Sequence, residues 1–172
     1  MWKVAAGRFG FGDFSMRILS FGLAIAAMTL SSADALAAAA TWKIEALPES
    51  APLYKQSGCM GSFSPKGNST QTVFIDDSAD VNSHADIKLD GKIFELNLIN
   101  SKVNGKVGGD TSGPGTHFDR SFKDKTGAVS VLAALIAGKD HPEADSTELA
   151  GMLSVTYKGT TQKIAIEGGV AC

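Results

Sequence analysis

The chain has few cysteines, few aromatic residues and no strong excess of charge of either sign. Its 172 residues include two cysteines, 8% aromatic residues and a formal net charge of −2. Two cysteines are too few for a zinc ribbon, an iron–sulfur site or a disulfide-dense small scaffold. Because nucleic-acid-binding proteins normally carry a marked basic excess, we expect no nucleic-acid partner. The length suits one domain with a hydrophobic core of its own.

The N-terminal apolar run is too short to span a bilayer. Residues 18–30 are mostly apolar, follow Met16-Arg17, and precede small and polar residues up to Ala37. A helix that spans a bilayer needs about 20 apolar residues. A secretory signal peptide typically has a basic residue, a shorter apolar stretch and an A-x-A cleavage motif. We therefore predict translation from Met16 and cleavage after Ala37, with no membrane span after processing.

Removal of residues 1–37 leaves residues 38–172 as a bacterial exported domain, periplasmic or secreted. Both cysteines, Cys59 and Cys172, belong to it. Exported compartments are oxidising, so two cysteines in a mature chain predict one disulfide bond. A Cys59–Cys172 bond would tie the C-terminus to the start of the domain.

Alternation of apolar and polar residues predicts β-structure throughout this domain. Asp90-Gly91 is a type I′ turn dipeptide between two alternating runs. This turn pairs Ile87 with Phe94. It places both residues, and every second residue along each strand, on the face that packs against the core. Asp86 falls on the opposite face, which the pattern predicts to be mostly exposed to water.

A second hairpin closes the chain. Gly159-Thr160 fits a type II′ turn, which would pair Val155 with Ile164 and Leu153 with Ile166. Further strands are predicted at residues 41–47, 59–64, 70–76 and 116–122, the last with Phe118 and Phe122 on one face. Residues 128–137 fit either a strand or a helical stripe, and the neighbouring strands favour a strand.

Three loops separate these strands, at residues 78–84, 100–115 and 139–147. The middle loop is glycine-rich and long for a small domain, which suggests mobility or function. The resulting fold prediction is all-β: a single small antiparallel barrel or sandwich of about seven or eight strands, closed by one disulfide.

Two groups of residues have the types that metal sites use. His117 and Asp119 stand two residues apart and therefore on one face of a strand, where they could bind a metal. Exposure of that face to water also explains the pair, and we favour this explanation. Asp140, His141, Glu143 and Asp145 cluster in residues 140–145, without the glycine and terminal glutamate of a calcium-binding loop. The sequence leaves open whether this loop binds a metal.

No motif in the sequence reaches the specificity of a catalytic site. Ser112 lies in a glycine-rich stretch that lacks the Gly-x-Ser-x-Gly turn, and no phosphate-binding or dinucleotide-binding loop is present. We therefore expect a protein that is not an enzyme and that has no cofactor.

The order of the motifs resembles that of a known family. An exported domain framed by two cysteines contains IKLDGKIFEL, then SGPGTHF, then YKGTTQKIAI before the last cysteine. This layout is similar to that of the small periplasmic β-barrel inhibitors of C-type lysozyme, and to other uncharacterised exported β proteins with two cysteines. In the inhibitors, a serine and a lysine reach into the lysozyme cleft. The resemblance assigns these roles to Ser112 and Lys158.

The resemblance implies a protein partner, because a lysine can pair with one of the two carboxylates of a lysozyme cleft and a hydroxyl can bond the other. The alternative is a small-ligand binder whose barrel mouth is rimmed by residues 100–115. A third class, a metal-dependent enzyme, would use His117, Asp119 and residues 140–145. The sequence determines neither the partner or ligand nor the oligomeric state.

Overall fold

The computed structural model describes residues 42–78, 82–104 and 113–172. The predicted signal peptide, with Met16 and Ala37, and Ser112 lie outside the described residues. Within these ranges are nine strands and two short 3-10 helices: β1 Ile44–Glu45, η1 Pro52–Lys55, β2 Met60–Pro65, β3 Phe74–Asp76, β4 His84–Leu89, β5 Lys92–Val103, β6 His117–Asp124, β7 Val129–His141, η2 Pro142–Ala144, β8 Ser146–Tyr157 and β9 Thr160–Ala171. No helix in the described part of the chain is long and apolar enough to cross a membrane.

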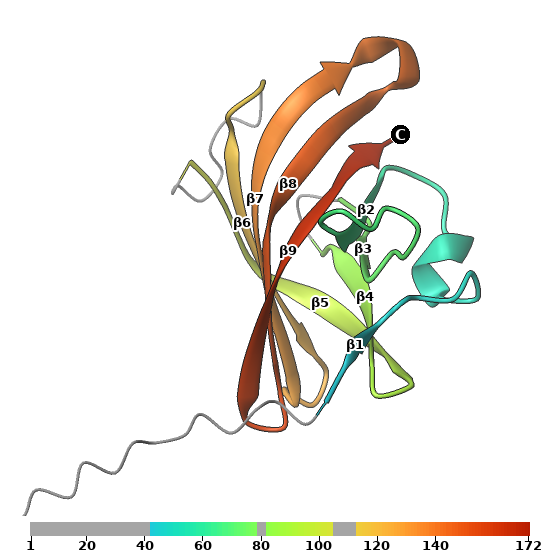
Figure 1. Ribbon diagram of the computed structural model, residues 1–172, viewed down its shortest axis with the longest axis vertical. Coiled ribbons are helices and arrows are strands. Elements are labelled where there is room, and N and C mark those ends of the chain that lie inside the picture. The colour runs from blue at the N-terminus through green and yellow to red at the C-terminus, as the bar shows by residue number, and fades with distance from the viewer. Residues whose placement is uncertain (1–41, 79–81, 105–112) are drawn as a thin grey trace, which may run out of the picture. The chain divides into compact units, whose positions relative to one another are not determined.

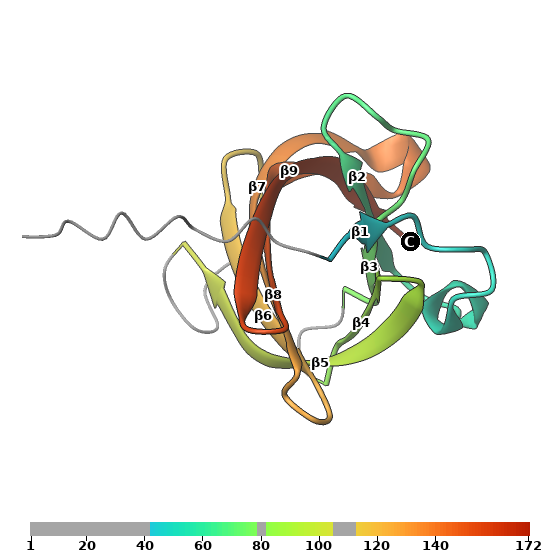
Figure 2. The same ribbon diagram turned by 60° about the horizontal axis from the view of Figure 1, so that its bottom comes forward.

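Strands β2 to β9 close into an eight-stranded antiparallel barrel. Each strand pairs with the next one along the chain, and β9 returns to pair with β2 (Figure 1). Figure 2 shows the strands arranged around a ring. The short strand β1 pairs with the end of β4 that β3 leaves uncovered, with Ile44 opposite Leu89. The all-β prediction is therefore confirmed, and the architecture is a barrel rather than a sandwich.

The β4–β5 hairpin has the predicted register. Ile87 pairs with Phe94 and Leu89 with Lys92. Asp90 and Gly91 have φ angles of 47° and 78°, and a type I′ turn requires positive φ at both positions. The turn residues and the alternation of the flanking strands specify the same pairing.

The β8–β9 turn differs from the prediction. It consists of Lys158 and Gly159, with φ angles of 49° and 75°, and it pairs Leu153 with Ile164 and Val155 with Gln162. Moving the turn by one residue moves the pairing by two positions, so each side chain keeps its face of the sheet. Alternation alone does not separate these two registers, and the type I′ turn with Lys158 at its first position prevails.

Residues 128–137 form a strand, as predicted, but the predicted loop at 139–147 is wrong. Strand β7 continues to His141 and β8 begins at Ser146, so η2 and one left-handed residue, Asp145, make the connection. The irregular pairing between Ala137 and Asp140 interrupts the alternation and hides this extension in the sequence.

The remaining predicted strands differ mainly in length. The predictions at 59–64 and 116–122 correspond to β2 and β6. Those at 41–47 and 70–76 are shortened to β1 and β3, because backbone bonds outside the strands, such as Leu47 N to Thr72 O at 2.8 Å, replace regular pairing.

On the outer face of β4, His84 is exposed as predicted, but Asp86 is not. Asp86 is 1% exposed, because the segment that contains η1 covers it together with Ile75. Leu53 and Ala51 of that segment belong to a second hydrophobic cluster, separate from the barrel core. The Leu53 N–H donates a hydrogen bond to Asp86 Oδ2 at 2.9 Å.

The predicted disulfide is present between Cys59 and Cys172. It lies next to the last pair of the β2–β9 ladder, Met60 opposite Ala171. The bond therefore joins the first and last strands of the barrel where they close the ring.

Candidate functional site

One end of the barrel is closed by aromatic side chains. Trp42 is 2% exposed and donates a hydrogen bond from Nε1 to Thr160 Oγ1 at 2.6 Å. Its ring packs edge-on against Tyr157, which in turn packs edge-on against Phe94. The Gln162 side chain donates to the Trp42 carbonyl and holds the chain in place. This end, which also carries the turns at 90–91 and 158–159, is filled by side chains.

The other end of the barrel contains a cavity of about 250 Å³. At about 30 Å³ of liquid per molecule, this volume would hold on the order of eight waters. Its walls are largely apolar and come from strands around the barrel: Phe63, Val103, Phe118, Leu135, Ala137, Leu149 and Val170.

The floor of the cavity is a buried ion pair. Arg120 Nη1 lies 2.6 Å from Asp76 Oδ2, and these side chains are 11% and 1% exposed. Both side chains point into the barrel, because alternate residues of a strand share a face. On β6, Arg120 alternates with the inward-facing Phe118 and Phe122, and on β3, Asp76 is the next alternate residue after the inward-facing Phe74. Phe74 and Phe122 are fully buried and pack edge-on, so the polar layer lies on the hydrophobic core.

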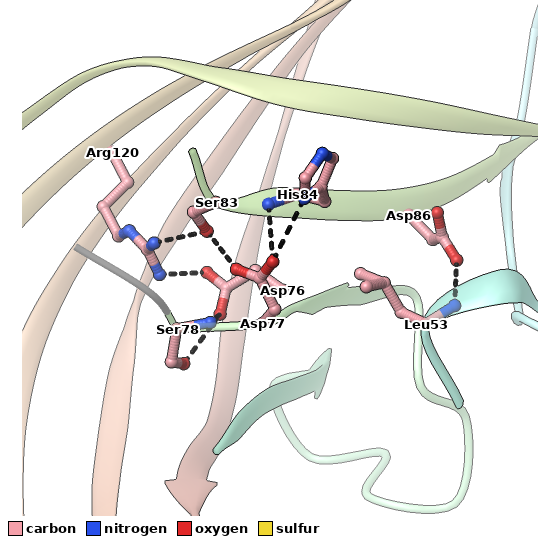
Figure 3. A network of polar contacts seen from close by, with 8 residues as sticks. All are labelled: Leu53, Asp76, Asp77, Ser78, Ser83, His84, Asp86 and Arg120. Atoms are coloured by element: carbon pink, nitrogen blue, oxygen red, sulfur yellow. Dashed lines mark hydrogen bonds and ion pairs between the residues drawn. The ribbon is translucent and has the colours of Figure 1, made fainter. Parts of the chain in front are cut away.

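Hydroxyl groups complete the polar layer (Figure 3). Arg120 Nη2 donates to Ser83 Oγ at 2.7 Å. Ser78 donates to Asp76 Oδ1 from both its hydroxyl, at 2.9 Å, and its backbone N–H, at 3.2 Å. Burial raises the pKa of Asp76, and the charge of Arg120 and the bonds from Ser78 oppose this rise. The carboxylate thus has donors on both oxygens.

The layer continues to the surface through Asp77. Ser83 donates from its hydroxyl to Asp77 Oδ1, and the backbone N–H of His84 donates to Oδ2 at 2.9 Å. His84 Nδ1 lies 3.3 Å from the same oxygen, as Figure 3 shows. The serine contacts the aspartate rather than the histidine, so the three side chains do not form a hydrolytic triad, in which the histidine lies between the nucleophile and the acid.

Asp140 and Thr147 form a polar part of the cavity wall on the β7–β8 hairpin. The Thr147 hydroxyl donates to Asp140 Oδ1 at 2.7 Å. Asp140 follows the irregular pairing after Ala137, which reverses the usual alternation and brings a carboxylate to the cavity. Its charge makes this part of the wall acidic.

Of the two residues assigned by resemblance, the structure describes Lys158. Lys158 is on the β8–β9 turn at the closed end, with half of its side chain exposed, and donates to Asp90 Oδ2 at 2.8 Å. Ser112 lies outside the described residues. Its neighbour Gly113 lines the cavity at the open end.

The other predicted candidates lie on the outside. His117 and Asp119 are exposed on the outer face of β6, as the spacing predicts. His141 contacts two glutamates of the β7–β8 hairpin, with Nε2 at 2.8 Å from Glu148 and Nδ1 at 3.5 Å from Glu143. Over the described ranges, no group of three or more His, Cys, Asp or Glu side chains has the arrangement of a metal site.

Sequence reasoning missed Asp76 and Arg120. The signal for Arg120 was available: Phe118 and Phe122 share a face, and Arg120 lies between them on that same face. A cation on an apolar strand face predicts a buried partner. Nothing in the sequence, however, indicates which carboxylate it contacts.

Comparison of the chain with protein-family models, with curated proteins and with solved structures found no match.

Proposed function

We propose that the protein is a non-enzymatic exported binding protein that takes a small ligand into the open end of its barrel. The observation that carries this proposal is the 250 Å³ cavity, with apolar walls over a hydrogen-bonded polar floor. An eight-stranded barrel is just wide enough to be filled by side chains or to hold one small ligand. Among the residues that the structure describes, side chains fill one end and leave the cavity at the other.

The polar floor favours binding over a purely structural role. A buried ion pair carries a large desolvation cost, and apolar residues of similar size often stabilise a core equally well. A polar group at the bottom of an apolar cavity orients a ligand and discriminates between head groups.

A substitution that fills the cavity with a larger side chain tests this proposal. Ala137 lines it, whereas Ala150, on the adjacent strand, points outward and is exposed. Hexanamide, hexanoate and hexylamine are titrated into the purified protein while the methyl NMR signals of Leu135 and Leu149 are recorded. We expect at least one probe to shift these signals, the Ala137→Phe variant to lose the response, and Ala150→Phe to keep it. No shift with any probe, or an equal response in Ala137→Phe, would contradict the proposal.

Export is part of the same proposal. It is supported by the signal-peptide pattern before Ala37 and by the disulfide, which is typical of oxidising compartments. N-terminal sequencing of protein recovered from the periplasm of an expressing bacterium should begin at Ala38. Retention of residues 1–15 would contradict this processing.

Inhibition of C-type lysozyme is the second candidate function. Lys158 favours it, because the turn presents its ammonium group at a barrel end and Asp90 orients it. We expect Lys158→Ala to weaken inhibition in a lysozyme turnover assay at least tenfold, and Lys163→Ala, an exposed lysine on β9, to have no effect. Absence of inhibition at micromolar protein would remove this candidate and leave the ligand proposal untouched.

A further inference from the structure

We infer that the ligand of the barrel cavity carries an uncharged head group that both donates and accepts hydrogen bonds, such as a primary amide or an alcohol, on a short apolar body. This inference rests on the proposed function and specifies the ligand class of the same site. It follows from the charges and hydrogen-bonding groups of the cavity floor.

The charges on the floor are already balanced. Asp76 and Arg120 form a contact pair with almost no exposure to water. A ligand that brings a third charge to this layer loses its hydration and finds Asp76 and Arg120 already paired with each other, which is costly in a low-dielectric site. An uncharged head group avoids this cost.

The floor offers both donors and acceptors. Ser78 and Ser101 line the cavity beside the ion pair, and a hydroxyl group can donate one hydrogen bond and accept others. Beside these hydroxyls, the Asp76 carboxylate is an acceptor and the Arg120 guanidinium is a donor group. A head group that donates and accepts at once matches this mixed set better than a carboxylate, which only accepts, or an ammonium, which only donates.

Asp140 adds a second reason against anions. It is the third ionisable side chain of the lining, and Thr147 is its hydrogen-bond partner. Among the residues that the structure describes, the ionisable groups that line the cavity are two carboxylates and one guanidinium. A carboxylate ligand would meet the net negative charge of these three groups.

The cavity walls determine the size and polarity of the part of the ligand beyond its head group. Apart from Asp140 and Thr147, the walls are largely apolar and include Phe118, Leu135 and Leu149. The volume is below the roughly 300 Å³ of typical drug-sized pockets. A single short alkyl chain fits this space.

The first experiment ranks three probes with the same six-carbon body. Dissociation constants of hexanamide, hexanoate and hexylamine are measured at pH 7 from the Leu135 and Leu149 methyl shifts of the purified protein. We expect hexanamide to bind at least tenfold more tightly than either ion. Equal or tighter binding of hexanoate or hexylamine would overturn the inference while the proposed function stands. If none of the three binds, both fall.

The second experiment removes one charge at a time. In Asp76→Asn the Arg120 guanidinium loses its opposite charge, so the anionic hexanoate should become the preferred probe. In Arg120→Gln the preference should move to hexylamine. Asp119→Asn, one residue from Arg120 but on the outer face, should keep the wild-type order. Unchanged preferences in folded single variants would refute the role of the pair.

Removing one partner of a buried pair costs several kcal/mol, so a single variant that fails to fold is replaced by the double variant. Asp76→Asn with Arg120→Gln keeps the polar layer without its charges. We expect this protein to bind hexanamide with the wild-type preference over both ions. A preference for either ion in the double variant would count against the inference.

Discussion

Removal of the disulfide tests how the barrel is held closed. Cys59 and Cys172 are separated by 113 residues, so the bond encloses nearly the whole described domain. In the chain-entropy model a loop of this length restricts the unfolded chain by about 4–5 kcal/mol. Native strain would subtract from that figure, so it is an upper value. The free energy of unfolding of the Cys59→Ser/Cys172→Ser variant should be lower by an amount approaching it.

Urea denaturation followed by far-UV circular dichroism measures the effect. With a slope of about 2 kcal/mol/M, the urea midpoint should fall by about 2 M. A reducing agent should shift the wild-type curve to that of the variant and leave the variant unchanged. A loss below about 1 kcal/mol, with the disulfide intact in the wild type, would refute the chain-entropy reasoning for this barrel.

Two further variants test local features of the fold. Burial raises the pKa of Asp86, and the bond from Leu53 opposes the rise, so the native state prefers the protonated carboxyl and loses stability as that group ionises. Asp86→Asn should therefore be more stable than the wild type at pH 7. In urea titrations at several pH values, this difference in the free energy of unfolding should vanish below pH 3.8, the ordinary pKa of the carboxyl group. An equal gain in stability at pH 3 would contradict this reasoning. At Gly168 a Cβ would lie 1.9 Å from the backbone oxygen of Ser62, so Gly168→Ala should cost about 3 kcal/mol. Gly138→Ala, whose Cβ would lie 3.3 Å from Glu148 Cβ, should cost much less in the same assay.

The sequence predicts those parts of the fold in which local and long-range signals coincide. Asp90-Gly91 requires a turn with positive φ, and the flanking alternation requires the same pairing, so the β4–β5 register is correct. At the β8–β9 hairpin, alternation allowed two turns that differ by one residue. Lys158 at positive φ is uncommon for a residue with a side chain, so turn statistics favoured the wrong one.

Features that depend on contacts distant in the sequence were not predictable. Asp86 alternates with apolar residues and was placed on an exposed face, but the segment around Leu53, 33 residues away, covers it. The ion pair across the barrel joins residues 44 positions apart. A strand pattern reports which face a side chain occupies, not which other strand or segment lies opposite that face.

The position of the disulfide agrees with the position of the cavity. At the closed end, Trp42, Tyr157 and Phe94 connect strands by packing across the interior, so the ring is held there without a covalent bond. At the open end a cavity replaces such packing, and strand β2, which lines it through Phe63, is one of the shorter strands of the barrel. The Cys59–Cys172 bond lies at the same end of the pairing between β2 and β9. The covalent bond thus closes the ring at the end where, among the described residues, a cavity takes the place of aromatic packing.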